Sequence, residues 1–357
     1  MLDKKDAQWW IDEVQKHPEH ASDLVRALAD RLAFLDQQNE ELRGEVITLK
    51  RRTRTGVSNG DEEALRRRIQ SLEAALKRGG ISDSALMFYA PDRIERLIPA
   101  SAWAQTAYVA SPEVRFLRCE AAMQLYIITA ESRVFAMDFE DLPLPQDGKA
   151  ASLGNPNNVA VMVDQGSFQR ARFGVLRTQN GYVYHALAGA LAAAGARGEK
   201  LIRTLIPGDP IVDLLPAFNG DLFGVSVQGR WTRFPERAIA GSGSQVMSLP
   251  KNDSLLALIP LESDSVTVYL VGAEGRLWAR PATSFSARKA PGVSAGQIKG
   301  VNPLLGAGTG STLHILSRRG KIHEIGLERL REAASTEQGI GLPGLSGADL
   351  PQLVLFS

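Results

Sequence analysis

The sequence predicts an all-β, six-bladed β-propeller preceded by an N-terminal α-helical coiled coil. Two observations carry this prediction. A heptad pattern of apolar residues spans residues 25–49, within a stretch of 80 residues that contains few Pro or Gly residues. Beyond them a strand–turn–strand pattern occurs six times, with further short apolar strands between the copies.

Composition and charge are those of an ordinary globular protein. The chain has 357 residues, of which 44% are hydrophobic and 23% are charged. Lys and Arg number 41 against 40 for Asp and Glu, so a charge-driven partner must meet a local patch. No signal-like core and no run of 18 uncharged apolar residues occurs, and Cys119 is a single cysteine. We therefore expect a cytoplasmic protein.

Residues 1–80 are expected to form a helical region that contains a parallel coiled coil. Between residues 25 and 49, apolar positions alternate in steps of three and four around one Asn. This pattern favours a parallel homodimer, because two buried amides satisfy each other only in register. The predicted dimerisation residues are Val25, Leu28, Leu32, Leu35, Asn39, Leu42, Val46 and Leu49. The alternative is an amphipathic helix that packs on its own domain.

The coiled coil is expected to break at residues 54–60, where two glycines indicate a turn, and a second helix is expected over 61–78. Basic residues flank this break and could meet phosphates. They follow the heptads, whereas in basic-zipper proteins they precede them, so a solvated flank is the other interpretation. Ahead of the coiled coil, Trp9 and Trp10 belong to a small apolar face that suits packing or a partner surface.

The six copies of the hairpin pattern predict six blades over residues 84–357. They recur every 40 to 49 residues, a period typical of radial blades. Their turn positions are Asp92, Ser132, Gly181, Gly229, Gly275 and Gly320. The C-terminal strand LPQLVLFS is expected to pair with the first repeat and so close the ring without exposed edges. An Ala-rich insert at 185–205 is expected to be helical and to cover a rim or pack on the coiled coil.

The six copies in phase resemble the C-terminal β-pinwheel domain of the DNA gyrase and topoisomerase IV A subunits. The resemblance covers residues 84–357. It implies blades made of a hairpin and a swapped strand, with duplex DNA bound and bent around the outer rim by basic side chains. The implied DNA-binding residues are Arg93, Arg133, Arg230, Arg233, Arg237, Arg276, Arg280, Arg288, Lys289, Arg318, Arg319 and Lys321.

Two details of the sequence bear on this resemblance. Five of the implied residues directly follow a turn position, and Tyr182 stands there in the third copy. The gyrase A family also carries a Gln-Arg-Gly-Gly-Arg/Lys-Gly box, which wrapping requires. The nearest stretches, at 240–245 and 337–344, lack its basic residues. Active wrapping is therefore not expected.

The sequence carries no catalytic signature. No counterpart of the gyrase breakage-reunion region or ATPase is present, and the glycine-rich stretch at 306–312 lacks the Lys of a phosphate loop. No Cys/His spacing for a metal occurs, and no cofactor is expected. We expect a non-catalytic DNA-binding architectural protein, a dimer that bridges or bends duplex DNA in the nucleoid.

The alternative is a scaffold in which the ring and the N-terminal helix dock protein partners and DNA binding has been lost. Charge on the rim discriminates between the two. Basic residues on one continuous rim favour DNA, whereas interleaved acidic residues favour a scaffold.

Overall fold

The computed structural model describes residues 84–103, 105–120, 123–145, 149–301, 303–345 and 349–357. The chain divides into two units, residues 1–82 and 83–357, and the fold below is that of the second unit. The predicted coiled coil with its break and second helix lies outside the described residues, as do Trp9 and Trp10.

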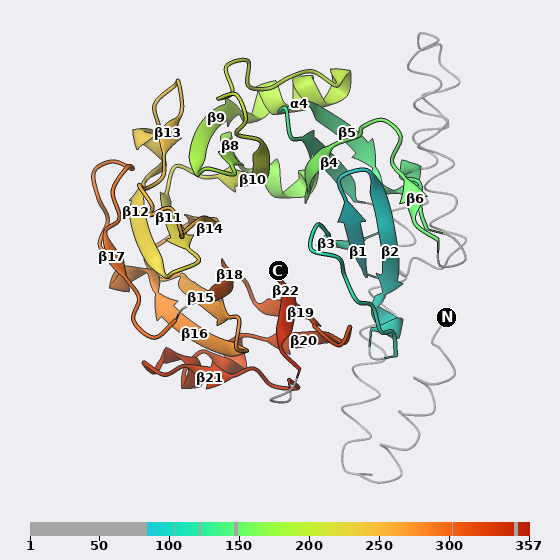
Figure 1. Cartoon of the computed structure of the whole chain (residues 1–357). Coiled ribbons are helices and arrows are strands. Elements are labelled where there is room, and N and C mark those ends of the chain that lie inside the picture. Colours follow the sequence, from blue (N-terminus) through green and yellow to red (C-terminus); the bar gives the residue numbers. More distant parts are fainter. Residues whose placement is uncertain (1–83, 104, 121–122, 146–148, 302, 346–348) are drawn as a thin grey trace, which may run out of the picture. The chain divides into compact units, whose positions relative to one another are not determined.

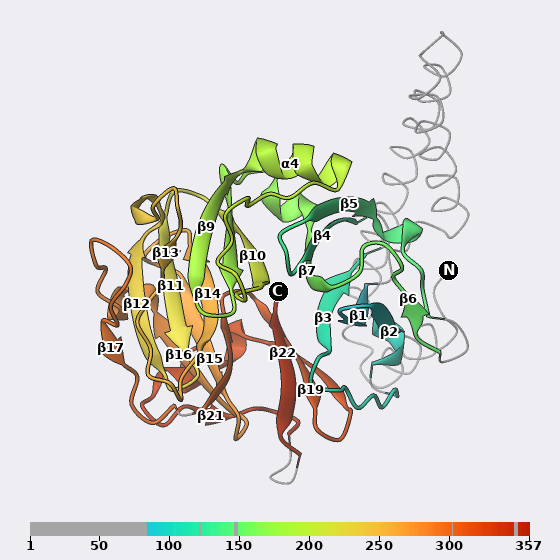
Figure 2. The same cartoon turned by 45° about the horizontal axis from the view of Figure 1, so that its top comes forward.

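Six β-hairpins are arranged in one ring and are numbered as blades 1 to 6 in chain order (Figures 1 and 2). All six coincide with the predicted copies. They are β1 (Ala85–Ala90) with β2 (Arg93–Pro99), β4 (Gln124–Thr129) with β5 (Val134–Asp138), β8 (Phe173–Thr178) with β9 (Tyr182–Leu187), β11 (Asp221–Ser226) with β12 (Arg230–Pro235), β15 (Thr267–Gly272) with β16 (Arg276–Pro281), and β19 (Thr312–Ser317) with β20 (Ile322–Gly326).

Each hairpin gains an inner strand that pairs with its first strand and faces the centre of the ring (Figure 1). The inner strands are β3 (Arg115–Cys119), β7 (Val159–Asp164), β10 (Ile211–Ala217), β14 (Leu255–Leu261), β18 (Leu304–Gly308) and β22 (Pro351–Phe356). Four blades also have a short outer strand. These are β6 (Ala151–Ser152), β13 (Ser244–Gln245), β17 (Gly296–Gln297) and β21 (Ile340–Gly341).

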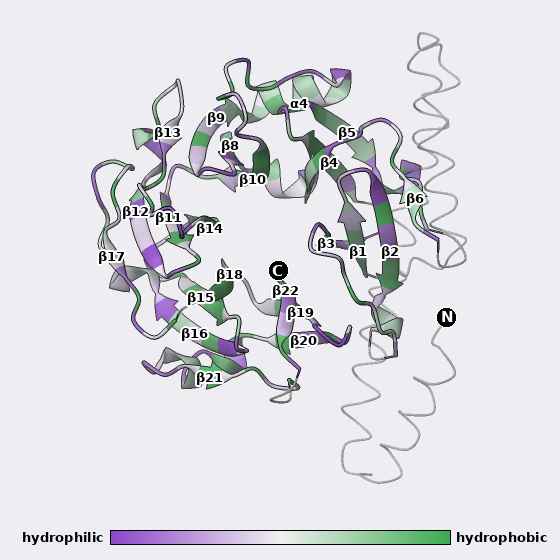
Figure 3. Ribbon diagram, viewed as in Figure 1, coloured by the Kyte–Doolittle hydropathy of each residue, from purple (hydrophilic) through white to green (hydrophobic). Residues whose placement is uncertain are grey.

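The first strand of each hairpin is buried on both faces, because the neighbouring blades cover it. In β1 all six residues are buried, and the other five first strands have five buried residues each. Hydrophobic residues accordingly gather in the central strands (Figure 3). The buried side chains form six clusters, one between each pair of adjacent blades. Blade-to-blade packing therefore holds the ring together.

The outer segment of each blade comes from the following repeat. For example, β6 follows hairpin β4–β5 in the chain but pairs with β2 of blade 1. In every blade the turn-position carbonyl accepts one hydrogen bond from such a segment, at 2.8–2.9 Å. The donors are the backbone N–H groups of Leu153, Leu201, Val246, Ile298, Leu342 and Tyr108. The chain therefore links each blade to the next by exchange of a segment.

Short helices connect the strands. The 3₁₀ helices are η2 (Ala100–Ala102), η3 (Phe139–Asp141), η4 (Gln165–Phe168), η5 (Glu236–Ala238), η6 (Ala282–Ser284), η7 (Glu328–Leu330) and η8 (Ala333–Ser335). The Ala-rich insert forms α4 (Ala188–Arg197), a shorter helix than predicted, which covers β5 on the outside of blade 2. Gly195 permits this contact, because a Cβ there would lie 3.2 Å from Ala136 and Tyr126. No described helix is long and apolar enough to cross a membrane.

The ring closes differently from the prediction. The C-terminal strand β22 pairs with β19 of its own blade, not with the first repeat. Closure instead comes from the segment after hairpin β1–β2, whose Tyr108 N–H donates to the Gly320 carbonyl at 2.8 Å. The Gln352 side chain also donates to the Ala110 carbonyl at 2.6 Å. Blades 6 and 1 are therefore joined by the same kind of exchanged segment that joins every other pair of adjacent blades. Direct pairing of the two terminal strands is not needed to close the ring.

A buried aspartate fixes the hairpin turn in blades 3, 4 and 6. In blade 4, Asp253 accepts hydrogen bonds from the Ser226 hydroxyl at 2.7 Å and from the Gln228 N–H at 3.0 Å. The Ser226 oxygen in turn accepts from the Arg230 N–H at 3.0 Å. Asp209 with Thr178 and Asp349 with Ser317 repeat the arrangement. The carboxylate thus satisfies turn donors that the sheet leaves unpaired.

Replacing Asp253 with Ala should lower the free energy of unfolding by about 2 kcal/mol, because the buried Ser226 hydroxyl and the Gln228 N–H lose a charged acceptor. Urea denaturation followed by circular dichroism measures the change. The exposed neighbour Asn252→Ala is the control and should change stability by less than about 0.5 kcal/mol. Equal effects of the two substitutions would show that the carboxylate does not fix the turn.

His314 is buried at the blade 6–blade 1 interface. Its ring lies 5.2 Å from that of Trp103, and its Nε2 is 3.2 Å from the Ser357 hydroxyl. Burial, with a contribution from Arg118, lowers the pKa of His314 to about 4. The folded protein therefore holds a neutral imidazole, whereas the unfolded chain takes up a proton below pH 6.5.

Stability from His314 is thus complete above pH 6.5 and is lost as the pH falls towards 4. Between pH 7 and pH 5 the loss should be about 2 kcal/mol. Urea denaturation at both pH values tests this against His314→Gln, which cannot take up the proton. If the free energy of unfolding of the variant falls between pH 7 and pH 5 by as much as that of the parent protein, the acid sensitivity belongs to other groups.

Candidate nucleic-acid interface

The six hairpin turns lie on one side of the ring, which we call the turn side, because the six blades repeat the same strand order around it. Five turn positions have positive φ angles of 64–81°, the left-handed region that favours glycine. The residue after each turn position lies at the start of the second strand or directly before it, and the turn position itself is bonded to the outer segment. Five of these residues are basic, namely Arg93, Arg133, Arg230, Arg276 and Lys321.

These five residues differ in how far their charges are compensated. Arg93 forms ion pairs with Asp92 at 2.8 Å and Glu95 at 2.7 Å, and the bond to Glu95 raises the pKa of its guanidinium. Arg276 donates to the Gln338 carbonyl at 2.6 Å. Arg230 lies 3.8 Å from the buried Asp253 carboxylate, and its side chain is 39% exposed. Lys321 is exposed and forms no ion pair with a described residue.

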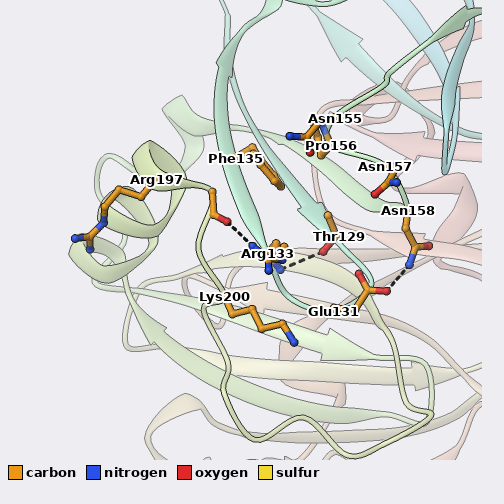
Figure 4. A pocket seen from close by; sticks show the side chains of 11 residues that line it. Thr129, Glu131, Arg133, Phe135, Asn155, Pro156, Asn157, Asn158, Arg197 and Lys200 are labelled. Carbon is orange, nitrogen blue, oxygen red and sulfur yellow. Dashed lines mark hydrogen bonds between the residues drawn. The ribbon is translucent and has the colours of Figure 1, made fainter. Parts of the chain in front are cut away.

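Arg133 lies beside an open hollow of about 790 Å³ between the outer segments of blades 1 and 2. It donates to the Gly198 carbonyl at 3.2 Å and pairs across the sheet with Lys200 (Figure 4). Asn155, Asn157 and Asn158 line the facing wall. The Asn158 amide donates to Glu131, the carboxylate nearest the hollow in Figure 4. Asn side chains, three cations and one carboxylate therefore line the hollow.

Arg318 and Arg319 flank the turn of blade 6 together with Lys321. Both side chains are exposed, and neither forms an ion pair with a described residue. Their backbone N–H groups hold the turn through the Leu350 carbonyl and the Asp349 carboxylate. The backbone is thus fixed while three cationic side chains project into solvent.

Arg233 holds blades 4 and 5 together and does not face solvent. Its side chain is 11% exposed and pairs with Asp221 at 2.7 Å and with Asp264. It also donates to the carbonyls of Ala282 and Phe285. Burial lowers the pKa of Arg233, but the bonds to the two carboxylates outweigh it and raise the pKa on balance. These bonds use the guanidinium donors that a phosphate would need.

Arg280 also has a structural position. It donates to the carbonyls of Ser335 and Thr336 at 2.9 and 3.0 Å and so fixes the chain after η8. Arg237, Arg288 and Lys289 are exposed. Arg237 lies on η5, at the end of blade 4 remote from its turn, and the Arg288 N–H bonds the Arg233 carbonyl near that end. The predicted set is therefore divided between the turn side, the blade interior and the far end.

Four basic residues on the turn side were missed by the sequence analysis. Arg197 and Lys200 come from the end of α4 and the segment after it, and Lys251 and Lys299 precede inner strands. They lie far in sequence from the hairpins that they adjoin. A sequence signal exists for some of them. In each repeat an outer segment follows the hairpin at a similar spacing, and a basic residue next to it, such as Lys299 after Ile298, can be assigned to the turn side.

Other titratable groups give no site. Among the described residues, no group of three His, Cys, Asp or Glu side chains could hold a metal ion. Cys119 is buried in β3, and burial raises the pKa of its thiol to about 12. Glu236 and His185 lie 3.5 Å apart between blades 3 and 4; burial raises the pKa of the first and lowers that of the second.

The ring matches solved structures over most of its length. One match is the C-terminal domain of DNA gyrase A, with a TM-score of 0.57 and 11% identity over 76% of this chain and 99% of that domain. A second is the C-terminal domain of DNA topoisomerase IV, with a TM-score of 0.51 and 15% identity over 77% of this chain and 93% of that domain. The ring has the β-pinwheel fold.

This confirms the resemblance at the level of the fold, including the six blades and the exchanged outer segments. No protein-family model and no curated protein matches the sequence. The pinwheel is therefore shared at low sequence identity, and the residues of this chain must carry any argument about what it binds.

Proposed function

We propose that the pinwheel binds duplex DNA through the basic side chains of its turn side, and that the protein acts without catalysis as a DNA-binding architectural protein. The observation that carries this proposal is the group of Arg318, Arg319 and Lys321. They are exposed around one rigid turn, and no described carboxylate pairs with them. Phosphate contacts of this kind supply most sequence-independent affinity for DNA.

The fold supports the same proposal, because the matched pinwheels are domains of DNA gyrase A and DNA topoisomerase IV. The balanced charge of the chain does not oppose it, since phosphate contact depends on local charge. The proposed contact set keeps the turn-side residues and leaves out Arg233 and Arg280, whose donors are occupied by carboxylates and carbonyls.

Dimerisation through residues 25–49 completes the proposal. A parallel coiled coil would join two pinwheels, so each ring raises the effective concentration of the other on one DNA molecule. Two rings could also hold two duplex segments and thereby bridge them. Bending or bridging in the nucleoid would follow without any active site.

The test is a titration of the full-length protein against a labelled random-sequence duplex at several salt concentrations. We expect the logarithm of the binding constant to fall linearly with the logarithm of salt concentration, with a slope of about −5. No binding at low salt would overturn the proposal and favour protein partners for the ring.

A substitution in the predicted coiled coil tests the dimer. Leu35→Glu should give a monomer and weaken binding at least about tenfold, because the second ring is lost. Ala33→Glu, at an outward heptad position, is the matched control and should leave both the mass and the affinity unchanged. Sedimentation equilibrium gives the mass, and a dimeric Leu35→Glu protein would contradict the predicted seam.

A further inference from the structure

Uncompensated basic charge on the turn side is concentrated in alternate blades. Blade 4 shows this most clearly, because Arg230, Lys251 and Lys299 converge on one turn. Arg230 opens β12 directly after Gly229. Lys251 precedes Asp253, whose carboxylate holds the turn at Gln228, and Lys299 follows Ile298, whose N–H bonds the Gly229 carbonyl at 2.9 Å. Three segments distant in sequence therefore bring three cations to one place.

Blade 6 has the same number of cations from a single segment. Arg318, Arg319 and Lys321 surround Gly320, and the buried Asp349 fixes the backbone between them. In blades 4 and 6 the carboxylate near the cations is this buried turn aspartate, which is already engaged by a hydroxyl and an N–H group. Arg230 lies 3.8 Å from the Asp253 carboxylate, whereas no described carboxylate forms an ion pair with Lys251 or Lys299 in blade 4 or with the three cations of blade 6. Three cations thus stand against one carboxylate at each of these two turns.

Blade 2 carries a third, weaker group. Arg133 and Lys200 are adjacent across the sheet at the rim of the hollow, and both are exposed (Figure 4). Glu131 is engaged by the Asn158 amide, and Glu199 pairs with Arg197 at 3.3 Å. Arg133 and Lys200 form no ion pair with a described residue, and together with Arg197 they set three cations against the two carboxylates of Glu131 and Glu199.

Blades 1, 3 and 5 lack such groups. In blade 1, Asp92 and Glu95 both pair with Arg93. In blade 3, Tyr182 follows the turn, and the turn residues Gln179 and Asn180 are uncharged. In blade 5, Arg276 has one exposed carboxylate, Glu274, two residues before it in the same turn. A phosphate that approached these turns would meet carboxylates or neutral side chains.

Building on the proposed function, we propose that duplex DNA is held at three separate points of the turn side, the turns of blades 4, 6 and 2, and not along a continuous belt of five basic residues. Carboxylates beside Arg93 and Arg276 offset the attraction of those cations for a phosphate, whereas the cations of blades 4 and 6 reinforce one another. Lys251, Lys299 and Lys200 thereby join the contact set, and Arg93 and Arg276 leave it.

Single alanine substitutions in the full-length chain test this distribution. Lys251→Ala, Lys299→Ala and Lys321→Ala should each weaken binding to a random-sequence duplex several-fold and reduce the steepness of the salt dependence by about 1. Lys200→Ala should have a smaller effect of the same kind. Arg93→Ala and Arg276→Ala, at equivalent turn positions, are the matched controls and should change affinity by less than about twofold.

A substitution that is expected to raise the affinity for DNA strengthens the test. Glu274→Gln removes the carboxylate beside Arg276 and should raise affinity, because blade 5 then presents an uncompensated cation. Urea denaturation of each variant verifies that the pinwheel stays folded, and all substituted side chains are at least partly exposed.

The outcomes separate this inference from the proposed function. Absence of DNA binding by the unsubstituted protein would overturn both. Binding by that protein with equal losses for Arg93→Ala, Arg276→Ala and Lys299→Ala would leave DNA binding in place and overturn the alternating distribution. Losses confined to Lys251, Lys299, Lys321 and Lys200 would support it.

Discussion

Replacement of Arg233 by alanine is expected to lower the free energy of unfolding by about 3 kcal/mol, although the sequence presents this residue as a DNA contact. The guanidinium pairs with Asp221 within blade 4 and ties β12 to blade 5 through Asp264 and the carbonyls of Ala282 and Phe285. Its removal leaves buried acceptors without a donor and a space between two blades. Urea denaturation of the purified variant measures the loss.

Arg237→Ala is the matched control for Arg233→Ala. Arg237 lies four residues further along blade 4 and is exposed on η5, so its removal should change stability by less than about 0.5 kcal/mol. In a DNA titration at several salt concentrations, an Arg233→Ala protein that remains folded should keep the salt slope of the parent. A stable variant with a reduced slope would show that Arg233 contacts phosphate after all.

Gly320→Ala should be the most damaging substitution at a turn position, because Gly320 closes the ring. A Cβ there would lie 2.7 Å from the Tyr108 nitrogen, and the residue has a φ of 81°. Strain at positive φ costs about 1 kcal/mol, and displacement of the Tyr108 backbone should add about 2 kcal/mol. The amide of Tyr108, which donates to the Gly320 carbonyl, should then exchange its hydrogen faster.

Gly275→Ala isolates the contribution of ring closure. Gly275 holds the same turn position in blade 5 with the same φ of 81°, but a Cβ there would lie 3.5 Å from Pro351, an ordinary contact. This variant should lose only about 1 kcal/mol. Similar losses for the two variants, with unchanged exchange at Tyr108, would show that the segment around Tyr108 does not close the ring.

The hairpins could be predicted from the sequence because their signals are local. A short apolar run followed by a glycine or a small polar residue at the turn is contained in some fifteen consecutive residues. All six turn positions therefore match the structure. The short apolar strands between the copies could be predicted for the same reason, and the predicted C-terminal strand LPQLVLFS contains β22.

Partners that come from another repeat could not be predicted in this way. Pairing of β6 with β2, or the bond from Tyr108 to Gly320, depends on segments that return to the preceding blade. The expected pairing of the C-terminal strand with the first repeat was wrong because it assumed that the termini must pair directly. The structure closes the ring with the same exchanged segment that joins the other blades.

The candidate site was predicted in part for a related reason. The sequence shows the basic residue after a turn, but it does not show which carboxylates neutralise the charge of that residue in the folded protein. Glu95 neutralises Arg93 from the same strand, and Asp264 engages Arg233 from another blade. Conversely, Lys251 and Lys299 reach the turn of blade 4 from segments 22 and 70 residues beyond Gly229. Spatial neighbours decide which cations can meet a phosphate.

Protection of lysines from acetylation, measured by mass spectrometry on the full-length protein with and without duplex DNA, tests the central claim most directly. Lys251, Lys299 and Lys321 on the turn side should lose reactivity when DNA is bound, whereas Lys289, near the remote end of blade 4, should keep it. Protection of Lys289 with no change at the three turn-side lysines would contradict the account.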